Sequence, residues 1–245
     1  NAHVFRVGTY KSAVEPYMRD GMSSEAREDF TGVYAALFDA WKADVTKARP
    51  KANLKLVTED PAGWIKASGG NAARAALAAG LVDRIGSRVD FGNRVAELVG
   101  KDDLENRPGG FAHTTLRTFA NSLPSPTPGK AIGVVTIAGE IVDGDAGPGK
   151  AGGDRIAKLL DDALDDDLAG LVVRVDSPGG SVIASERIRE AILRHKAKKL
   201  PVVVSMANLA ASGGYWVSTP GTRIFAEPAT ITGSIGVFSV IPSFE

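Results

Sequence analysis

Residues 171–181 read LVVRVDSPGGS, an apolar run that ends in a glycine-rich turn. The β-branched residues of this run predict a buried strand over 171–175. Beyond the turn, apolar residues recur at helical spacing and predict a helix over 181–196. The stretch therefore predicts a strand, a tight turn and a helix in succession.

The same order recurs at residues 201–214, PVVVSMANLAASGG, where a predicted strand over 201–206 leads to a second glycine-rich turn. An earlier strand is predicted over 132–137 and a helix over 152–164. Alternating strands and helices are typical of parallel βαβ units. We therefore predict an α/β fold with a parallel sheet and flanking helices.

The first block of the chain, residues 1–105, has a different character. A short strand at its start is followed by an apolar stripe that predicts one long helix, with Ser23 or Ser24 as its cap and Pro50 just beyond its end. Further helices are predicted over 71–82 and 88–99. Prolines and glycines gather over 106–130, including Pro126 and Pro128, and predict a linker. Residues 131–245 form the second block.

Composition excludes several classes of function. The chain has 245 residues, a net charge of +0 and no cysteine. A disulfide framework, a zinc–thiolate site and a cysteine nucleophile are therefore excluded. The chain also lacks the excess of positive charge that would favour a nucleic-acid binder. No apolar run is long enough to span a membrane. Because the sequence begins at Asn1 without Met, we expect a processed chain or a fragment.

The two glycine-rich turns suggest a catalytic site. If their strands are neighbours in a parallel sheet, both turns lie at one edge, and Ser212 faces the backbone of Gly179 and Gly180. A serine nucleophile requires such N–H donors near the developing oxyanion. The alternative is that Ser212 only caps the following helix.

A serine nucleophile also needs a base. None of the three histidines lies in a glycine-rich turn, and His195 is expected on a solvated helix end. Lys11 is a candidate base because its sequence neighbours are small or apolar. A lysine can accept a proton near neutral pH only where burial lowers its pKa by about 2–3 units.

Two other features have simpler explanations. Residues 144–151, GDAGPGKA, nearly match a phosphate-binding loop, but Ala151 lacks the metal-binding hydroxyl and Pro148 lacks an N–H. A flexible loop is favoured here. Five aspartates over 161–167 are interpreted as a solvated helix end rather than a metal site.

Several stretches together resemble the signal peptide peptidases of the SppA type, in their long two-repeat form. The resemblance is carried by residues 10–17 (YKSAVEPY), 174–186 (RVDSPGGSVIASE), 201–206 (PVVVSM), 209–216 (LAASGGYW) and 229–237 (ATITGSIGV). It implies a ClpP/crotonase-like fold and a Ser/Lys dyad peptidase, with Ser212 as nucleophile and Lys11 as general base. It also implies an oxyanion hole from Gly179, Gly180 and Gly213, and no cofactor or metal.

The resemblance further implies the setting of the enzyme. The substrate would be a cleaved signal peptide or a similar short apolar segment. A homo-oligomer, expected to be a tetramer, would be anchored in the bacterial inner membrane by a segment outside this chain, with the catalytic domain on the periplasmic side. Residues 79–86, AGLVDRIG, resemble the end of a repeat. Residues 1–105 would then be the C-terminal half of the first repeat, and 131–245 the N-terminal half of the second.

Two other classes of function stay open on the sequence. One is a crotonase-like acyl-CoA enzyme that uses the glycine-rich turns as its oxyanion hole. The other is a non-catalytic scaffold or a nucleotide binder that uses residues 144–151.

Overall fold

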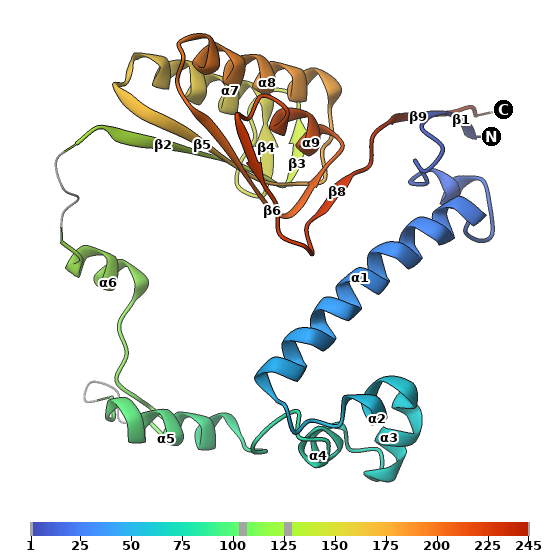
Figure 1. Cartoon of the computed structure of the whole chain (residues 1–245), viewed down its shortest axis with the longest axis vertical. Helices are drawn as coiled ribbons and strands as arrows, with labels where there is room; N and C mark the ends of the chain where they lie inside the picture. The colour runs from blue at the N-terminus through green and yellow to red at the C-terminus, as the bar shows by residue number, and fades with distance from the viewer. Residues whose placement is uncertain (1, 103–106, 125–128, 245) are drawn as a thin grey trace. The chain divides into compact units, whose positions relative to one another are not determined.

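A computed structural model describes residues 2–102, 107–124 and 129–244 (Figure 1). Contacts divide the chain into two compact units. Unit 1 comprises residues 1–40 and 129–245, and unit 2 comprises residues 41–128. The N-terminal residues thus belong to the same unit as the second sequence block. The assignment of the two blocks to halves of successive repeats stays a prediction.

The centre of unit 1 is a parallel sheet of five strands in the order β2-β5-β6-β7, in which β8 also pairs with β6. Its strands are β2 (Ala131–Ala138), β5 (Leu168–Ser177), β6 (Val202–Ala211), β7 (Arg223–Phe225) and β8 (Ile231–Gly233). A two-stranded parallel pair, β3 (Glu140–Val142) with β4 (Lys150–Gly152), accompanies it. The predicted parallel α/β architecture is confirmed.

Three helices belong to this sheet: α7 (Gly153–Asp162), α8 (Val182–Ala197) and α9 (Gly213–Ser218). A short 3-10 turn, η2 (Ala163–Asp165), follows α7. In Figure 1, α7 and α8 lie along the sheet. Alternate residues of the strands, such as Val173, Val175 and Val204, are fully buried with Ile156 and Ile188 of the helices. Burial of this apolar face is the main stabilising contribution to the sheet.

The ends of unit 1 are joined by an antiparallel pair. Strand β1 (Ala2–Val7) pairs with β9 (Val237–Pro242), and Val7 lies opposite Val237. On the sheet side, β8 pairs with the end of β6, so that Gly233 lies opposite Ala211. The segment after β1 is therefore held beside the segment between β8 and β9, next to the end of β6.

A hydrogen-bonded network joins the loop after β1 to the long helix α1 (Ser24–Ala48). Ser23 caps this helix, because its Oγ accepts a hydrogen bond from the Ala26 N–H at 3.1 Å. The Glu15 carboxylate, in the 3-10 turn η1 (Glu15–Tyr17), accepts hydrogen bonds from the Ser23 N–H at 2.9 Å and the Ser23 hydroxyl at 2.6 Å. The predicted long helix and its serine cap are confirmed.

Unit 2 is helical in its described residues. Its elements are α2 (Leu54–Glu59), α3 (Pro61–Ala67), α4 (Ala72–Ala78), α5 (Arg88–Val99) and α6 (Leu116–Ser122). Helix α5 begins with a capping box between Ser87 and Asp90. Helix α6 lies within the predicted linker and is capped by Thr115. Pro126 and Pro128 of that linker lie outside the described residues.

Among the described residues, no helix combines the length and the hydrophobicity needed to cross a bilayer.

Candidate active site

Ser212 lies at the junction between β6 and α9 and has an unusual backbone conformation. Its φ is 52° and its ψ is −118°, outside the region that serine normally adopts. Its side chain makes no capping hydrogen bond to α9, which argues against the alternative that it only caps this helix. The Ser212 N–H donates to the Gly233 carbonyl at 2.7 Å, and this bond ties the turn to β8. Backbone strain of this kind is typical of a functional site.

Lys11 lies in the loop after β1 and directs its amine toward Ser212. Its Nζ lies 3.3 Å from the Ser212 Oγ, 3.1 Å from the Ser234 Oγ and 2.8 Å from the Ser234 carbonyl oxygen. The residue is only 9% exposed. This burial lowers the pKa of Lys11 from its ordinary value, because desolvation disfavours the ammonium form.

The contacts of Lys11 orient its nitrogen for proton transfer. A neutral amine has two N–H donors and one lone pair. When the Ser234 carbonyl and the Ser234 hydroxyl accept the two N–H bonds, the lone pair is left for the Ser212 hydroxyl. The sequence-predicted residues Lys11 and Ser212 are therefore brought together in a geometry that suits a general base and its nucleophile.

The turn after β5 approaches Ser212 so closely that it requires glycine. Gly179 has a φ of 91°, and a Cβ at this position would lie 2.8 Å from the Ser212 Cβ and collide with the Gly213 nitrogen. Gly180 has a φ of 150°, and a Cβ there would collide with the Ile141 carbonyl oxygen. The two glycine-rich turns thus lie against each other, as the sequence predicts.

Not all three glycines of the predicted oxyanion hole have a free N–H group. The Gly179 N–H already donates to the Ser177 hydroxyl at 3.1 Å. Within the described part of the chain, no hydrogen bond uses the N–H of Gly180 or Gly213. A Cβ added at Gly213 would lie 3.3 Å from the Gly180 nitrogen, so these two glycines are neighbours in space. Gly180 and Gly213 are therefore the donors that could hold an oxyanion.

Two further serines support the site and were missed at the level of sequence. Ser234, with a φ of 52°, provides both Lys11 acceptors described above. Ser177 is fully buried, and its hydroxyl donates to the Gly139 carbonyl at 2.7 Å while it accepts from Gly179. Both lie inside stretches that carry the family resemblance, and this position was the signal in the sequence that could have found them. Nothing local separates them from ordinary turn serines.

The expectation for His195 is wrong. Its side chain is buried, and its Nε2 lies 2.7 Å from the Leu160 carbonyl oxygen of α7. The last turn of α8 packs against α7, so this face of the helix is not solvated. His195 is therefore a core residue with a hydrogen-bond partner, and it has no part in the candidate site.

Several polar groups of the loop over 144–151 already have partners within unit 1. The Gly144 carbonyl accepts from the Asp154 N–H at 3.0 Å, and the Ala146 carbonyl accepts from the Arg155 Nε at 3.0 Å. Lys150 lies 3.5 Å from Glu140, in an ion pair. A phosphate would have to compete with this carboxylate for the lysine, so the geometry does not favour nucleotide binding.

Three of the five aspartates over 161–167 form ion pairs at the surface. Asp161 binds Arg194 at 2.7 Å, Asp162 binds Lys158 at 2.7 Å and Asp167 binds Lys130 at 2.7 Å. Exposed pairs of this kind contribute little to stability. Among the residues that the structure describes, no three histidine, aspartate or glutamate side chains are grouped so that they could hold a metal ion.

Comparison with known protein families decides the family of this chain. Residues 1–102 and 194–245 match the model for peptidase family S49, and these ranges include both Lys11 and Ser212. The chain belongs to peptidase family S49. The S49 match covers more than half of the sequence and agrees with the resemblance carried by the motifs.

Three bacterial proteins are similar to this chain. The chain is 41% identical over its full length to Protease 4 of Salmonella typhi and 38% identical over 99% of its length to Protease 4 of Haemophilus influenzae. A shorter match, 40% identical over 34% of this chain and 23% of the relative, is to a putative signal peptide peptidase SppA of Enterococcus faecium. The chain spans 40% of the length of either Protease 4.

Proposed function

We propose that this chain provides the catalytic dyad of a serine peptidase, with Ser212 as nucleophile and Lys11 as general base. The observation that carries the proposal is the 3.3 Å contact between the Lys11 Nζ and the Ser212 Oγ, made by a desolvated amine. Membership of S49 gives independent support. Desolvation matters because only the neutral amine can accept the serine proton.

The proposed reaction follows from the positions of these groups. The Ser212 Oγ attacks the carbonyl carbon of the scissile peptide bond, and its proton passes to the Lys11 Nζ. The N–H groups of Gly180 and Gly213 then bind the oxyanion of the tetrahedral intermediate. As the C–N bond breaks, Lys11 returns the proton to the leaving amine. Water hydrolyses the acyl-enzyme by the same route, with Lys11 again as base.

The substrate we propose is a short apolar peptide, such as the remnant of a cleaved signal peptide. The support is the motif resemblance and the name of the Enterococcus faecium relative. For the whole protein we propose a membrane-anchored homo-oligomer whose catalytic domain faces the periplasm. Two measurements test this setting. Fractionation of cells with and without an accessible periplasm tests the membrane anchor and the side on which the catalytic domain lies. Native mass determination of the extracted protein tests the oligomer.

A fluorogenic peptide assay on the full-length protein tests the activity. Ser212→Ala should reduce turnover by several orders of magnitude, because it removes the nucleophile. Ser205→Ala is the matched control: this serine lies on β6, which ends just before Ser212, and its hydroxyl accepts a hydrogen bond from Arg174. Wild-type turnover in Ser212→Ala would overturn the proposal. Hydrolysis of acyl-CoA thioesters that survives Ser212→Ala would instead favour the crotonase-like alternative.

A further inference from the structure

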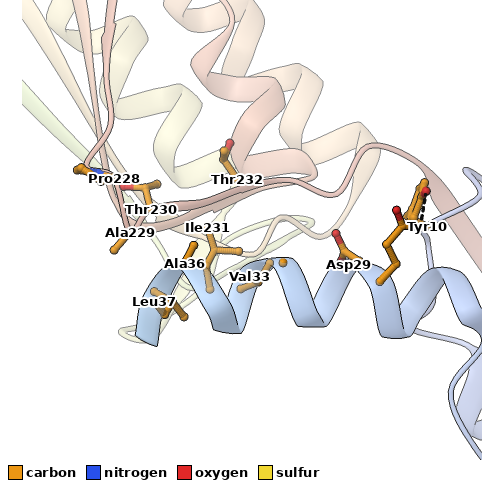
Figure 2. A pocket seen from close by; sticks show the side chains of 12 residues that line it. Tyr10, Asp29, Val33, Ala36, Leu37, Pro228, Ala229, Thr230, Ile231 and Thr232 are labelled. Carbon is orange, nitrogen blue, oxygen red and sulfur yellow. Dashed lines mark hydrogen bonds between the residues drawn. The ribbon is translucent and has the colours of Figure 1, made fainter. Parts of the chain in front are cut away.

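A groove of about 610 Å³ lies in unit 1 between α1 and the segment that leads into β8 (Figure 2). Its size suits several side chains of a bound peptide. Helix α1 contributes Glu28, Asp29, Val33 and Leu37 to one side, the β8 segment contributes Ile231 to the other, and Tyr10 lies at one end.

The two ends of the groove differ in chemistry. Figure 2 shows Leu37, Ala36 and Ala229 at one end and Tyr10 with Asp29 at the other. The first end is apolar. The second is acidic, because Glu28 and Asp29 are adjacent on the first turns of α1. A ligand that fills both ends would combine apolar groups with a positive charge.

The acidic end has no positive charge of its own. None of the described residues that line the groove is a lysine or an arginine. The Tyr10 hydroxyl donates to the Glu28 Oε2 at 3.2 Å. This hydrogen bond and the charges of Glu28, Glu25 and Asp29 raise the pKa of Tyr10, since the phenolate form is repelled by the carboxylates. The local potential is therefore negative and favours a cation.

The acidic end adjoins the proposed dyad. Tyr10 directly precedes Lys11, and Thr232 lies two residues before Ser234, which holds the Lys11 amine. Between them, the Gly233 carbonyl accepts the Ser212 N–H at 2.7 Å. The groove thus leads away from the dyad, with its acidic end nearest and its apolar end farthest.

We propose that this groove binds the substrate peptide on one side of the scissile bond and selects a basic side chain followed by apolar ones. Glu28 and Asp29 receive the lysine or arginine, and Val33, Leu37 and Ile231 receive the apolar residues. The inference rests on the proposed peptidase function and adds its specificity. A signal peptide presents this order to the groove when the cleaved bond lies before its basic region, since that region precedes the apolar one.

A peptide series tests the proposal on the full-length protein. One apolar fluorogenic peptide is made with a single Lys, Ala or Glu, and this residue is moved through the positions on both sides of the cleaved bond. At one position the wild type should prefer Lys over Ala by about threefold to tenfold in kcat/KM, the range expected for one or two partly exposed ion pairs. This preference should decrease with added salt.

Variants assign the preference to the groove. In the double variant Glu28→Gln with Asp29→Asn, the ratio of Lys to Ala peptides should fall to about one, and Glu28→Lys should favour the Glu peptide. Asp44→Asn is the matched control, since Asp44 lies on α1 outside the groove and its loss should leave the ratio as in the wild type.

Binding measurements separate this inference from the peptidase proposal. Labelled Lys and Ala peptides are titrated into Ser212→Ala, with and without the Glu28→Gln and Asp29→Asn changes, and their anisotropy is followed. Tighter binding of the Lys peptide that depends on the two carboxylates supports the groove even if no peptide is cleaved. Cleavage and binding that are equal for Lys, Ala and Glu at every position would overturn the inference and leave the peptidase proposal intact.

Discussion

The Lys11 Nζ and the Ser212 Oγ lie 3.3 Å apart although 201 positions separate the two residues in the chain. Two strand pairings produce this contact. The pairing of β1 with β9 fixes the Lys11 loop beside the segment that follows β8, and the pairing of β8 with β6 places that segment beside Ser212. The dyad therefore depends on contacts between the first and the last strands of unit 1.

The pH dependence of turnover should report the Lys11 amine. Burial lowers the pKa of Lys11, so the neutral amine becomes available at lower pH than for a free lysine. We expect kcat/KM to rise with pH through a single limb whose midpoint lies below the ordinary lysine value of about 10.4. The measurement is kcat/KM for one neutral peptide between about pH 6 and about pH 10. A flat profile over this range would count against Lys11 as the base.

Ser234→Ala should weaken the orientation of the base without removing it. One hydrogen bond is lost, while the Ser234 carbonyl continues to accept from Lys11. We expect kcat/KM to fall by about threefold to tenfold at its plateau. Because the Ser234 hydroxyl also accepts from the ammonium form, its loss should lower the Lys11 pKa further and move the limb to lower pH.

The control for Ser234 is Ser239→Ala, on the exposed part of β9. A fall in kcat/KM with no movement of the pH limb would show that Ser234 acts on the fold rather than on the amine. No change in either quantity would contradict its assignment as a positioning residue.

Gly179→Ala should disrupt the oxyanion hole. The added methyl group would press on the Ser212 Cβ and the Gly213 nitrogen, at a φ that disfavours alanine. We expect kcat to fall about a hundredfold or more, as for loss of an oxyanion donor. Gly147→Ala is the matched control, because a Cβ there has nothing within 4 Å. Equal activity of the two variants would argue against this turn as part of the site.

Acid should weaken the anchor of the Lys11 loop. The hydrogen bonds from Ser23 to the Glu15 carboxylate lower the pKa of Glu15. A depressed carboxylate pKa means that this contribution to stability is present above the unfolded value of about 4.3 and is lost as pH falls through the lower, folded value. The melting temperature of Glu15→Gln should therefore lie below that of the wild type at neutral pH, and the difference should shrink in acid. A difference that stays constant with pH would contradict this linkage.

The local elements of this fold follow from sequence patterns. The helix predicted over 88–99 is found as Arg88–Val99, and the strands on either side of α8 appear where β-branched residues gather. Ends are less well predicted. The helix predicted over 71–82 ends at Ala78, since Gly80 has a φ of 73° and stops it. Strand β6 continues beyond residue 206 to Ala211 because β8 gives it a partner.

The features that the sequence did not predict depend on contacts between residues far apart in the chain. The burial of His195 depends on α7, which lies outside its own helix. Ser234 becomes a partner of Lys11 only through the pairing of β1 with β9. Lys11 and Ser212 could be selected from the sequence because a lysine among small and apolar neighbours and a serine followed by two glycines are local features. The motif resemblance supplied the link between them.

The turnover of Lys11→Met tests the central claim most directly. Methionine keeps the length and burial of the side chain and removes its ability to accept a proton. Lys158→Met, at an exposed ion pair on α7, is the control for loss of a lysine. With folding of both variants verified by thermal melting, we predict that Lys11→Met loses peptide turnover by several orders of magnitude while Lys158→Met retains it. Turnover of a folded Lys11→Met close to the wild-type value would contradict the account.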